Sequence, residues 1–500
     1  MNFFSRIHLA LIAQLCFIAP LSTHAQFVQQ GNKLVGIGAV GTVHQGQSVA
    51  ISADGNTAIV GGNGDNNTAG ATWVFTRSGG VWTQQGNKLV GTGAVNVARQ
   101  GLSVAISADG NTTVVGGPLD NYDTANYSYR GATWVFTRTN GIWTQQGNKL
   151  VGTGAVGGAY QGRSVAISAD GNTAIVGGND DNNNAGATWV FTRSGGVWTQ
   201  QGSKLVGTDA IGLANQGWSG SLSADGNTAI VGGFGDNDGV GAVWVFTRSA
   251  GVWTEQGSKL VGTGAVSTAR QGYSVSISSD GNTALVGGYY DNNYTGAIWV
   301  FTRTGGVWTQ QGSKLVGTGA VGGAYQGTSV AISADGNTAL VGGNDITGAV
   351  WVFTRTGGVW TQLGSKLVGT GAVGGAYQGT SVAISADGNT AFSGGEGDNG
   401  GVGAAWIFSR PAVPILFSSA KSKLQRLNLE NNQLLHFNLS NQSQVTIRLY
   451  DSKGAVVKTL LNEVRSAGDY LQPLPKETKS NSYLLDFKAG EFHKTMKIDP

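Results

Sequence analysis

The sequence predicts an all-β protein, a seven-bladed β-propeller followed by a small Ig-like β-sandwich domain. Two observations support the propeller: a unit of 52 to 61 residues recurs seven times, and each unit contains four short strand-like segments separated by turns. Glycine accounts for 83 of 500 residues and charged residues for 12%, against typical values of about 7% and 25%. With 40% hydrophobic residues, this composition indicates turn-rich β structure rather than disorder.

Residues 1–25 are expected to be a signal peptide. Arg6 precedes an apolar run that ends at Leu21, and Thr23-His24-Ala25 fits a cleavage site before Gln26. A lipoprotein signal at Cys16 is the alternative, but the preceding residue is Leu15 where a small residue is needed. No later apolar run reaches the roughly 18 to 20 residues of a membrane span, so no transmembrane anchor is predicted.

The repeat is marked by a "DGN" turn in every copy. Its aspartates are Asp54, Asp109, Asp170, Asp225, Asp280, Asp335 and Asp387. In the third copy, strands are expected at "SVAISA", "TAIVGG", "GATWVFTR" and the "VWTQQG" segment, with tight turns between them. Four antiparallel strands per unit are typical of a propeller blade. A β-solenoid and a string of sandwiches are the alternatives, but solenoid coils are shorter and sandwiches need about 100 residues each.

The ends of the repeat array predict closure into a ring over residues 26–410. Residues 27–34 match the fourth strand of a unit, although they precede the first complete unit. The last unit stops after its third strand, at Arg410. We therefore expect the N-terminal segment to supply the missing strand of the last blade, which would remove an exposed sheet edge.

Thirteen tryptophans occupy matched positions in strands three and four of the units. Each buries about 150 to 250 Å² when it is enclosed, so we expect all thirteen to form the core between blades. Sugar-stacking platforms are the alternative interpretation.

The stretch "QGRSVAISADGNTAIVGG", residues 161–178, resembles the FG-GAP repeat of integrin α-subunit propellers and their bacterial relatives. Gln161-Gly162 stands where the family has Phe-Gly, and Gly177-Gly178-Asn179 where it has Gly-Ala-Pro. Only the second copy, with Gly116-Gly117-Pro118, keeps the proline. The pattern recurs over residues 27–410. This resemblance implies a propeller used in extracellular adhesion or ligand binding.

The calcium site of that family is not expected here. Family members often have an acidic loop of the form Asp-x-Asp/Asn-x-Asp-Gly between strands one and two, whereas the loop from Ser168 to Thr173 has one carboxylate. Calcium takes about six to eight oxygen ligands. No metal site is therefore predicted, although the Asp-Asn-Asn loops between strands two and three remain an alternative for weak metal binding. The loop also resembles the Asp-box of sialidases, but a hairpin turn accounts for it.

The chain changes character after Pro411 and Pro414, which predicts a linker over residues 411–425 and a separate domain over 426–500. This domain resembles the C-terminal sorting domain of the bacterial type nine secretion system, with Asn481-Ser482 where that family usually has Gly before Tyr. The matching features are Val445-Thr446-Ile447, Leu449-Tyr450-Asp451, Lys453-Gly454, Gly468, Tyr483-Leu484-Leu485, Gly490 and Lys497-Ile498. The resemblance implies passage across the outer membrane with the secretion machinery as partner, and it leaves cleavage and surface attachment open. A generic Ig-like module is the alternative.

The repeats are poor in groups that catalyse reactions, so we do not predict an enzyme, and no cofactor is expected. His44 is the only histidine of the array, and Glu255 and Glu396 are its only glutamates. An enzyme acting on polysaccharide would have to use carboxylates such as Asp180, Asp236 or Glu396. The net charge is +3 with no basic run, so nucleic-acid binding is not indicated.

Comparison of the seven copies predicts where function lies. The turn between strands one and two of a repeat (one-to-two) and the turn between strands three and four (three-to-four) hardly vary among the copies. The connection between strands two and three (two-to-three) and the connection from strand four to the first strand of the next repeat (four-to-one) vary freely. These two variable connections should open on the face opposite to the invariant turns. All ten tyrosines of the array fall in these variable connections. The candidate ligand-binding residues are Tyr122, Tyr127, Tyr129, Arg130, Tyr160, Arg163, Trp218, Tyr273, Tyr289, Tyr290, Tyr294, Tyr325 and Tyr377.

Tyrosine offers a broad apolar ring with one polar tip, and Asn or Asp beside it can hydrogen-bond hydroxyls or amides. The sequence therefore favours a protein that is secreted or attached to the outer surface of a bacterial cell and that binds an extracellular glycan or protein. The alternatives are a structural surface protein whose loops vary without consequence, and the polysaccharide-acting enzyme above.

Overall fold

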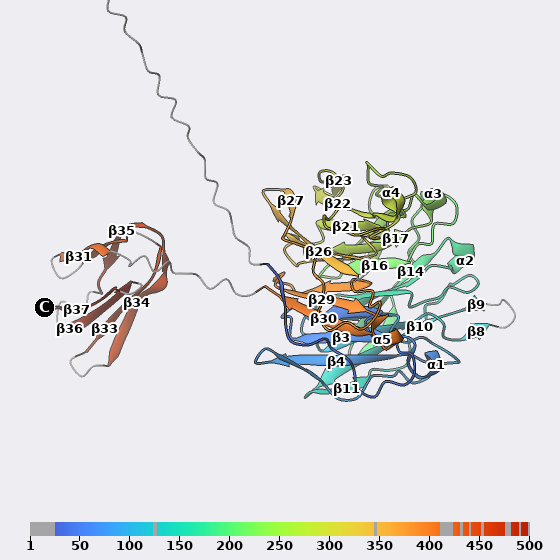
Figure 1. Ribbon diagram of the computed structural model, residues 1–500, viewed down its shortest axis with the longest axis horizontal. Helices are drawn as coiled ribbons and strands as arrows, with labels where there is room; N and C mark the ends of the chain where they lie inside the picture. The colour runs from blue at the N-terminus through green and yellow to red at the C-terminus, as the bar shows by residue number, and fades with distance from the viewer. Residues whose placement is uncertain are drawn as a thin grey trace, which may run out of the picture. The chain divides into compact units, whose positions relative to one another are not determined.

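The computed structural model describes residues 26–123, 128–344, 348–410, 424–430, 434–439, 442–451, 455–475, 482–489 and 492–498 (Figure 1). The predicted signal peptide, most of the predicted linker, Tyr127, Lys453-Gly454 and Gly490 lie outside these residues. The chain divides into two compact units, Met1–Pro411 and Ala412–Pro500.

The described residues of the first unit form seven four-stranded antiparallel sheets. Six of them run in chain order: β2–β5 (Ser48–Ile51, Thr57–Gly62, Ala71–Ser78, Val81–Gln84), β6, β7, β10 and β11 (Ser103–Ile106, Thr112–Gly117, Ala132–Thr139, Ile142–Gln145), β12–β15 (Ser164–Ile167, Thr173–Gly178, Ala187–Ser194, Val197–Gln200), β16–β19 (Ser219–Leu222, Thr228–Gly233, Ala242–Ser249, Val252–Glu255), β20–β23 (Ser274–Ile277, Thr283–Gly288, Ala297–Thr304, Val307–Gln310) and β24–β27 (Ser329–Ile332, Thr338–Gly343, Ala349–Thr356, Val359–Gln362). The seventh combines β28–β30 (Ser381–Ile384, Thr390–Gly395, Ala404–Ser409) with β1 (Val28–Gln29).

The connections between second and third strands carry the remaining short elements. These are the hairpin β8–β9 (Tyr122–Asp123, Ser128–Tyr129) and the four-residue segments α1–α5 (Asp65–Thr68, Asp181–Asn184, Asp236–Gly239, Asp291–Tyr294, Asp398–Gly401). Figure 1 shows them on one side of the unit. The predictions of an all-β chain and of a repeated four-stranded unit are confirmed, and the fold is propeller-like.

Each sheet is packed between two neighbours, because the two faces of its second strand belong to different hydrophobic cores. In β13, Ala174 and Val176 pack with residues of the preceding repeat, whereas Ile175 packs with residues of the following one. Every residue of β13 is accordingly buried. A single repeat taken alone would expose both of these faces to water.

The first and last repeats close on each other. Ala58 and Val60 of the first repeat share a core with Phe392 and Ile407 of the last. A ring of seven backbone hydrogen bonds joins the one-to-two turns in sequence and returns from Ala386 N to Ala53 O at 3.0 Å. The ring runs through residues 53, 108, 169, 224, 279, 334 and 386, with donor–acceptor distances of 2.9 to 3.1 Å.

The N-terminal segment completes the seventh sheet. In β1, Val28 pairs with Ser409 and Gln29 with Phe408 of β30. Phe27 is only 4% exposed and packs in the core of the last repeats. Nζ of Lys33 lies 2.6 Å from Oδ2 of Asp398. The last sheet thus obtains its fourth strand and an ion pair from residues at the opposite end of the array.

The thirteen tryptophans of the third and fourth strands fall into two groups. The seven in the third strands are fully buried: Trp73, Trp134, Trp189, Trp244, Trp299, Trp351 and Trp406. Each donates its indole N–H at 2.8 to 2.9 Å, and a glycine such as Gly152 packs so closely on the ring that a Cβ there would lie 2.1 Å from Cδ1 of Trp189. The six in the fourth strands are only half-buried and lie under arginine guanidinium groups, 5.3 to 5.4 Å from the ring centroids. These six pack against the cores between the sheets from the edge, so the expectation of thirteen core tryptophans holds fully for the third-strand group and only in part for the fourth-strand group.

The invariant "SADGNT" turns are saturated with internal hydrogen bonds. Ser168 Oγ donates to Asp170 Oδ1 at 2.5 Å, and Asn172 donates to the same carboxylate through its backbone and side-chain N–H groups at 2.9 and 3.0 Å. Burial is the largest influence and raises the pKa of Asp170, but these hydrogen bonds and the charge of Arg193 outweigh it, so the pKa falls below the ordinary 3.8. The other six turns show the same lowered pKa.

The described residues of the second unit form two sheets around one core. One sheet orders β31 (Leu424–Glu430), β32 (Leu434–Leu439) and β35 (Gly468–Pro473), and the other orders β34 (Val456–Arg465), β33 (Ser443–Tyr450), β36 (Tyr483–Ala489) and β37 (Phe492–Ile498). Alternate residues of β32 and β33 point inward, so that Phe437 of the first sheet and Ile447 and Phe487 of the second share the core. Among the described residues, no helix has the length and apolar character needed to cross a membrane.

The role of the N-terminal segment can be tested with Phe27→Ala. Removing this buried ring should lower the free energy of unfolding by about 3 kcal/mol in urea, because it leaves a cavity at the junction of the last sheet. Val28→Ala is the matched control, since Val28 is 52% exposed, and it should change the stability by less than about 0.5 kcal/mol. Equal stabilities for the two variants would contradict this account of closure.

The seven turn carboxylates predict loss of stability in acid. A carboxyl whose pKa is lowered in the folded state contributes stability above its unfolded pKa and loses it as pH falls through the folded pKa. The urea midpoint, followed by tryptophan fluorescence, should therefore be flat above about pH 5 and should fall once the pH drops below 3.8. A midpoint that stays constant from pH 5 to pH 2.5 would show that these hydrogen bonds do not favour the ionised carboxylates.

Candidate functional site

The variable connections meet on one side of the first unit, named the loop face here. It consists of the four-to-one connection that precedes each first strand and the two-to-three loop between each second and third strand. Seven parallel bridges join them: Gly70–Gln100, Gly131–Gln161, Gly186–Gln216, Gly241–Gln271, Gly296–Gln326, Gly348–Gln378 and Gly403–Gln45. The last bridge again links the two ends of the array.

An invariant Gln-Gly pair builds each four-to-one connection. Gln161 is buried, accepts from Gly152 N at 2.5 Å and donates to Gly152 O at 2.9 Å. Gly162 has φ +90°, and a Cβ there would lie 2.4 Å from Ala132 O, so only glycine fits. Arg163 N donates to Tyr160 O at 3.1 Å and closes a four-residue turn. The two variable positions of each copy are therefore the two ends of one turn.

The first of these positions is in the left-handed backbone region in all seven copies. The residues are His44, Arg99, Tyr160, Asn215, Arg270, Tyr325 and Tyr377, with φ between 49° and 57°. This conformation costs most residues about 1 to 2 kcal/mol, and glycine or asparagine adopt it most readily. Only Asn215 follows that preference. The backbone does not explain why the other six copies carry histidine, arginine or tyrosine.

The Asp-Asn-Asn motifs of the two-to-three loops have a structural role. Asp181 is 1% exposed, accepts from Val156 N at 2.7 Å and forms an ion pair with Nζ of Lys204 at 2.5 Å. Asn182 and Asn183 follow in the left-handed region, which asparagine tolerates. Within the described ranges, the same ion pair recurs at Asp65–Lys88, Asp120–Lys149, Asp236–Lys259, Asp291–Lys314 and Asp398–Lys33.

This pairing corrects two expectations from the sequence. The first aspartate of these motifs is buried against lysine, so it does not offer its carboxylate to a ligand on the loop face. Asp236, named above as a possible catalytic carboxylate, is among these buried groups. Asp180 is not part of these ion pairs, because it is the residue before the paired Asp181. Burial raises the pKa of Asp180, and the charge of Arg163 opposes this shift.

Six of the thirteen predicted site residues gather in one aromatic cluster. Neighbouring ring centroids lie 4.3 to 6.2 Å apart, and the rings come from connections of the fourth to sixth repeats. The members are Trp218, Phe234, Tyr273, Tyr289, Tyr290, Tyr294 and Tyr325. The cluster is not sealed as a core would be, since Tyr294 is 39% exposed and its other members are only partly buried.

Two arginines border the aromatic cluster. The Arg163 guanidinium lies 3.6 Å from the ring centroid of Trp218, and its Nε has no hydrogen-bond partner. Burial lowers the pKa of Arg163, while Tyr273 and Asp180 act in the opposite direction. Arg270 lies 4.2 Å from the ring centroid of Tyr290 and donates to the Tyr289 hydroxyl at 2.6 Å. Both contacts combine a cation with a π-face and hold the rings in place.

The remaining predicted residues lie elsewhere on the loop face. Tyr122, Tyr129 and Tyr160 form a second group, with centroid distances of 4.8 and 5.5 Å. Arg130 is exposed beside it. Tyr377 is 45% exposed, and its ring packs over Gly397, where a Cβ would lie 2.5 Å from Cδ2.

Sequence reasoning missed Phe234 and Arg270 as members of the site. Both signals were present in the repeat: Phe234 stands at the position of Tyr289 in the next copy, and Arg270 at the position of Tyr160 and Tyr325. A position-by-position alignment of the seven copies would have included both residues among the candidates.

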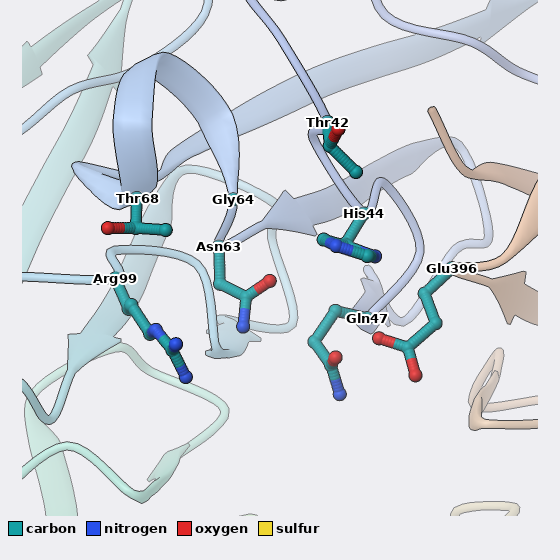
Figure 2. Close-up of a pocket in the computed structure, with 8 residues that line it drawn as sticks. All are labelled: Thr42, His44, Gln47, Asn63, Gly64, Thr68, Arg99 and Glu396. Atoms are coloured by element: carbon teal, nitrogen blue, oxygen red, sulfur yellow. The ribbon is translucent and has the colours of Figure 1, made fainter. Parts of the chain in front are cut away.

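A polar pocket of about 270 Å³ lies on the same face, where the first, second and last repeats meet (Figure 2). Its lining residues are Thr42, His44, Gln47, Asn63, Gly64, Thr68, Arg99 and Glu396. None of them was among the candidate ligand-binding residues, although Glu396 was named as a carboxylate that an enzyme would have to use. Burial raises the pKa of Glu396, and the neighbouring His44 acts against this shift.

Among the described residues, no group of three or more His, Cys, Asp or Glu side chains is placed to hold a metal ion. A scan against protein-family models and a search of curated proteins found no match to the sequence.

The left-handed position can be tested at Tyr377, because alanine and glycine both remove the ring and then differ only in the backbone preference. Tyr377→Gly should be more stable than Tyr377→Ala by about 1 kcal/mol, because only alanine keeps the Cβ that strains this backbone. Val373 is the matched control: it is 53% exposed without a positive φ, so its glycine variant should be the less stable one. The same order of stability at both positions would refute the strain argument.

Proposed function

We propose that this chain is a secreted or cell-surface recognition protein that binds an extracellular glycan or protein through the loop face of a seven-bladed β-propeller. The observation that carries the proposal is the aromatic cluster, seven partly exposed rings brought together from the connections of three adjacent repeats. Such rings give broad contact area at low entropic cost, with hydroxyl groups available for hydrogen bonds.

The backbone of the loop face supports a recognition role. Tyr160, Arg270 and Tyr325 occupy left-handed positions that glycine or asparagine would fill with less strain. Strain of this kind persists where surrounding structure enforces it, and it concentrates at ligand-binding sites. On the opposite side, the turn residues Ser168, Asp170 and Asn172 use their polar groups on one another, which leaves little for a ligand.

We propose binding rather than catalysis. Asp236 is enclosed in an ion pair, whereas Asp180 and Glu396 lie in separate surroundings: Asp180 beside Arg163, and Glu396 beside His44. General acid–base catalysis would need a group placed against the proton it transfers. The aromatic cluster, in contrast, has the features of a contact surface.

Export is the second part of the proposal. The signal peptide would direct the chain out of the cytoplasm, and the C-terminal unit would act as a sorting domain of the type nine secretion system with an Ig-like sandwich fold. Two sheets that share one core, with Val445-Thr446-Ile447 in β33 and Tyr483-Leu484-Leu485 in β36, are compatible with that role. The bound partner would then be found outside the cell.

The binding proposal can be tested with a panel of extracellular polysaccharides and matrix proteins. The double variant Tyr289→Ala/Tyr325→Ala should weaken binding at least tenfold, since it removes two rings from the cluster. The control is Val197→Ala/Val307→Ala, which removes exposed apolar side chains from three-to-four turns on the opposite side. Unchanged affinity in the tyrosine variant, or loss in the valine variant, would count against the loop face as the binding surface.

A further inference from the structure

The polar pocket contains a buried acceptor that the protein itself does not satisfy. Asn63 is 9% exposed, and its Oδ1 accepts no hydrogen bond. An unpaired buried polar atom costs about 1 to 3 kcal/mol. The corresponding residue of the third repeat, Asn179, instead donates its side-chain N–H to Asp180. Asn63 lines the pocket, so its unpaired acceptor lies at the wall of this cavity.

The pocket walls are fixed by packing of the first and last repeats. A Cβ on Gly64 would lie 2.9 Å from Cδ2 of His44, and a Cβ on Gly401 would lie 3.3 Å from its Cε1. The imidazole is therefore held between the two loops. Its backbone is anchored as well, because His44 N donates to Gly401 O at 2.8 Å. The pocket exists only because the array closes.

The charges around the pocket balance. Figure 2 shows Arg99 and Glu396 on opposite sides, with Asn63 and Gln47 between them. Glu396 is partly buried and can accept hydrogen bonds, and Arg99 is exposed and can donate them. One positive and one negative group give no net charge that would select an anion or a cation.

We propose that this pocket binds one uncharged sugar residue of an extracellular glycan. Sugar hydroxyls both donate and accept, so they match the acceptors Asn63 Oδ1 and Glu396 and the donor Arg99 at once. A volume of about 270 Å³ lies just below the usual range for drug-sized ligands, which fits a single ring. An amino acid would satisfy the two charges but would leave the hydroxyl and amide groups along the wall unused.

The pocket and the aromatic cluster both lie on the loop face, so a longer glycan seated in the pocket would extend along the same side of the unit. This inference rests on the proposed recognition role of the loop face and assigns it a ligand class.

The test uses the full mature chain and saturation-transfer NMR with methyl glycosides of glucose, galactose, mannose and N-acetylglucosamine. At least one should bind. Asn63→Leu and Glu396→Ala should each weaken it at least tenfold, because each removes an acceptor. Asn344→Leu is the matched control, since Asn344 holds the same position in the sixth repeat outside the pocket, and it should bind as the unmodified chain does. Arg99→Ala changes an exposed side chain and should weaken binding even if a buried variant fails to fold.

Two results would overturn the inference. One is stronger binding of glucuronate or L-alanine than of any methyl glycoside. The other is absence of methyl glycoside binding while a polysaccharide or protein of the panel still binds through Tyr289 and Tyr325. This second result would leave the proposed function standing. If the tyrosine variant bound every panel member normally while the sugar still bound the pocket, the proposed aromatic surface would fail instead.

Discussion

A closed ring of seven backbone hydrogen bonds holds each one-to-two turn to the next, and the architecture of the first unit follows from that closure. The donors and acceptors belong to the residue before each turn aspartate, such as Ala53 and Ala386. Because Ala174 and Ile175 belong to cores on opposite sides of one sheet, every sheet needs two neighbours. An open row would leave two sheets half-exposed. The pairing of β1 with β30 removes the last free edge.

Closure also explains how a near-identical repeat can carry a specific site. The side chains that maintain the ring are satisfied locally: the buried Gln161 by Gly152, and the turn carboxylate of Asp170 by Ser168 and Asn172. These interactions recur in each copy and leave the loop face free to vary. Divergence at the two turn positions of the four-to-one connections, together with changes in the two-to-three loops, then places aromatic rings beside one another in three repeats and polar groups together at the junction.

The fold could be read from the sequence because its signals are local. Asp-Gly and Gly-Gly turns, alternating strands and a seven-fold period predict repeated four-stranded sheets without knowledge of distant contacts. The burial of the third-strand tryptophans followed from size and apolar character. The partial exposure of Trp82 and its equivalents could not be predicted, because each ring packs on the edge of a core and is covered by an arginine such as Arg77 across the strand pair.

The candidate site was less predictable because it depends on tertiary contacts. The lysine of the "KLVG" segments and the first aspartate of the loops recur together, but 23 residues separate Lys204 from Asp181, and only the structure shows their ion pair. His44 and Glu396 lie at opposite ends of the array and meet through closure of the ring. Left-handed backbone at Tyr160 and Tyr325 has no sequence signature, since asparagine or glycine would be expected there.

The division into a framework side and a binding side is the central claim. Hydrogen exchange measured on the full chain, with and without a polysaccharide or protein found to bind it, tests this claim most directly. The account predicts slower exchange in the four-to-one connections and two-to-three loops, including residues 211–218, 266–273 and 289–295, with no change in the "SADGNT" turns. Protection confined to those turns, or to the C-terminal unit, would contradict it.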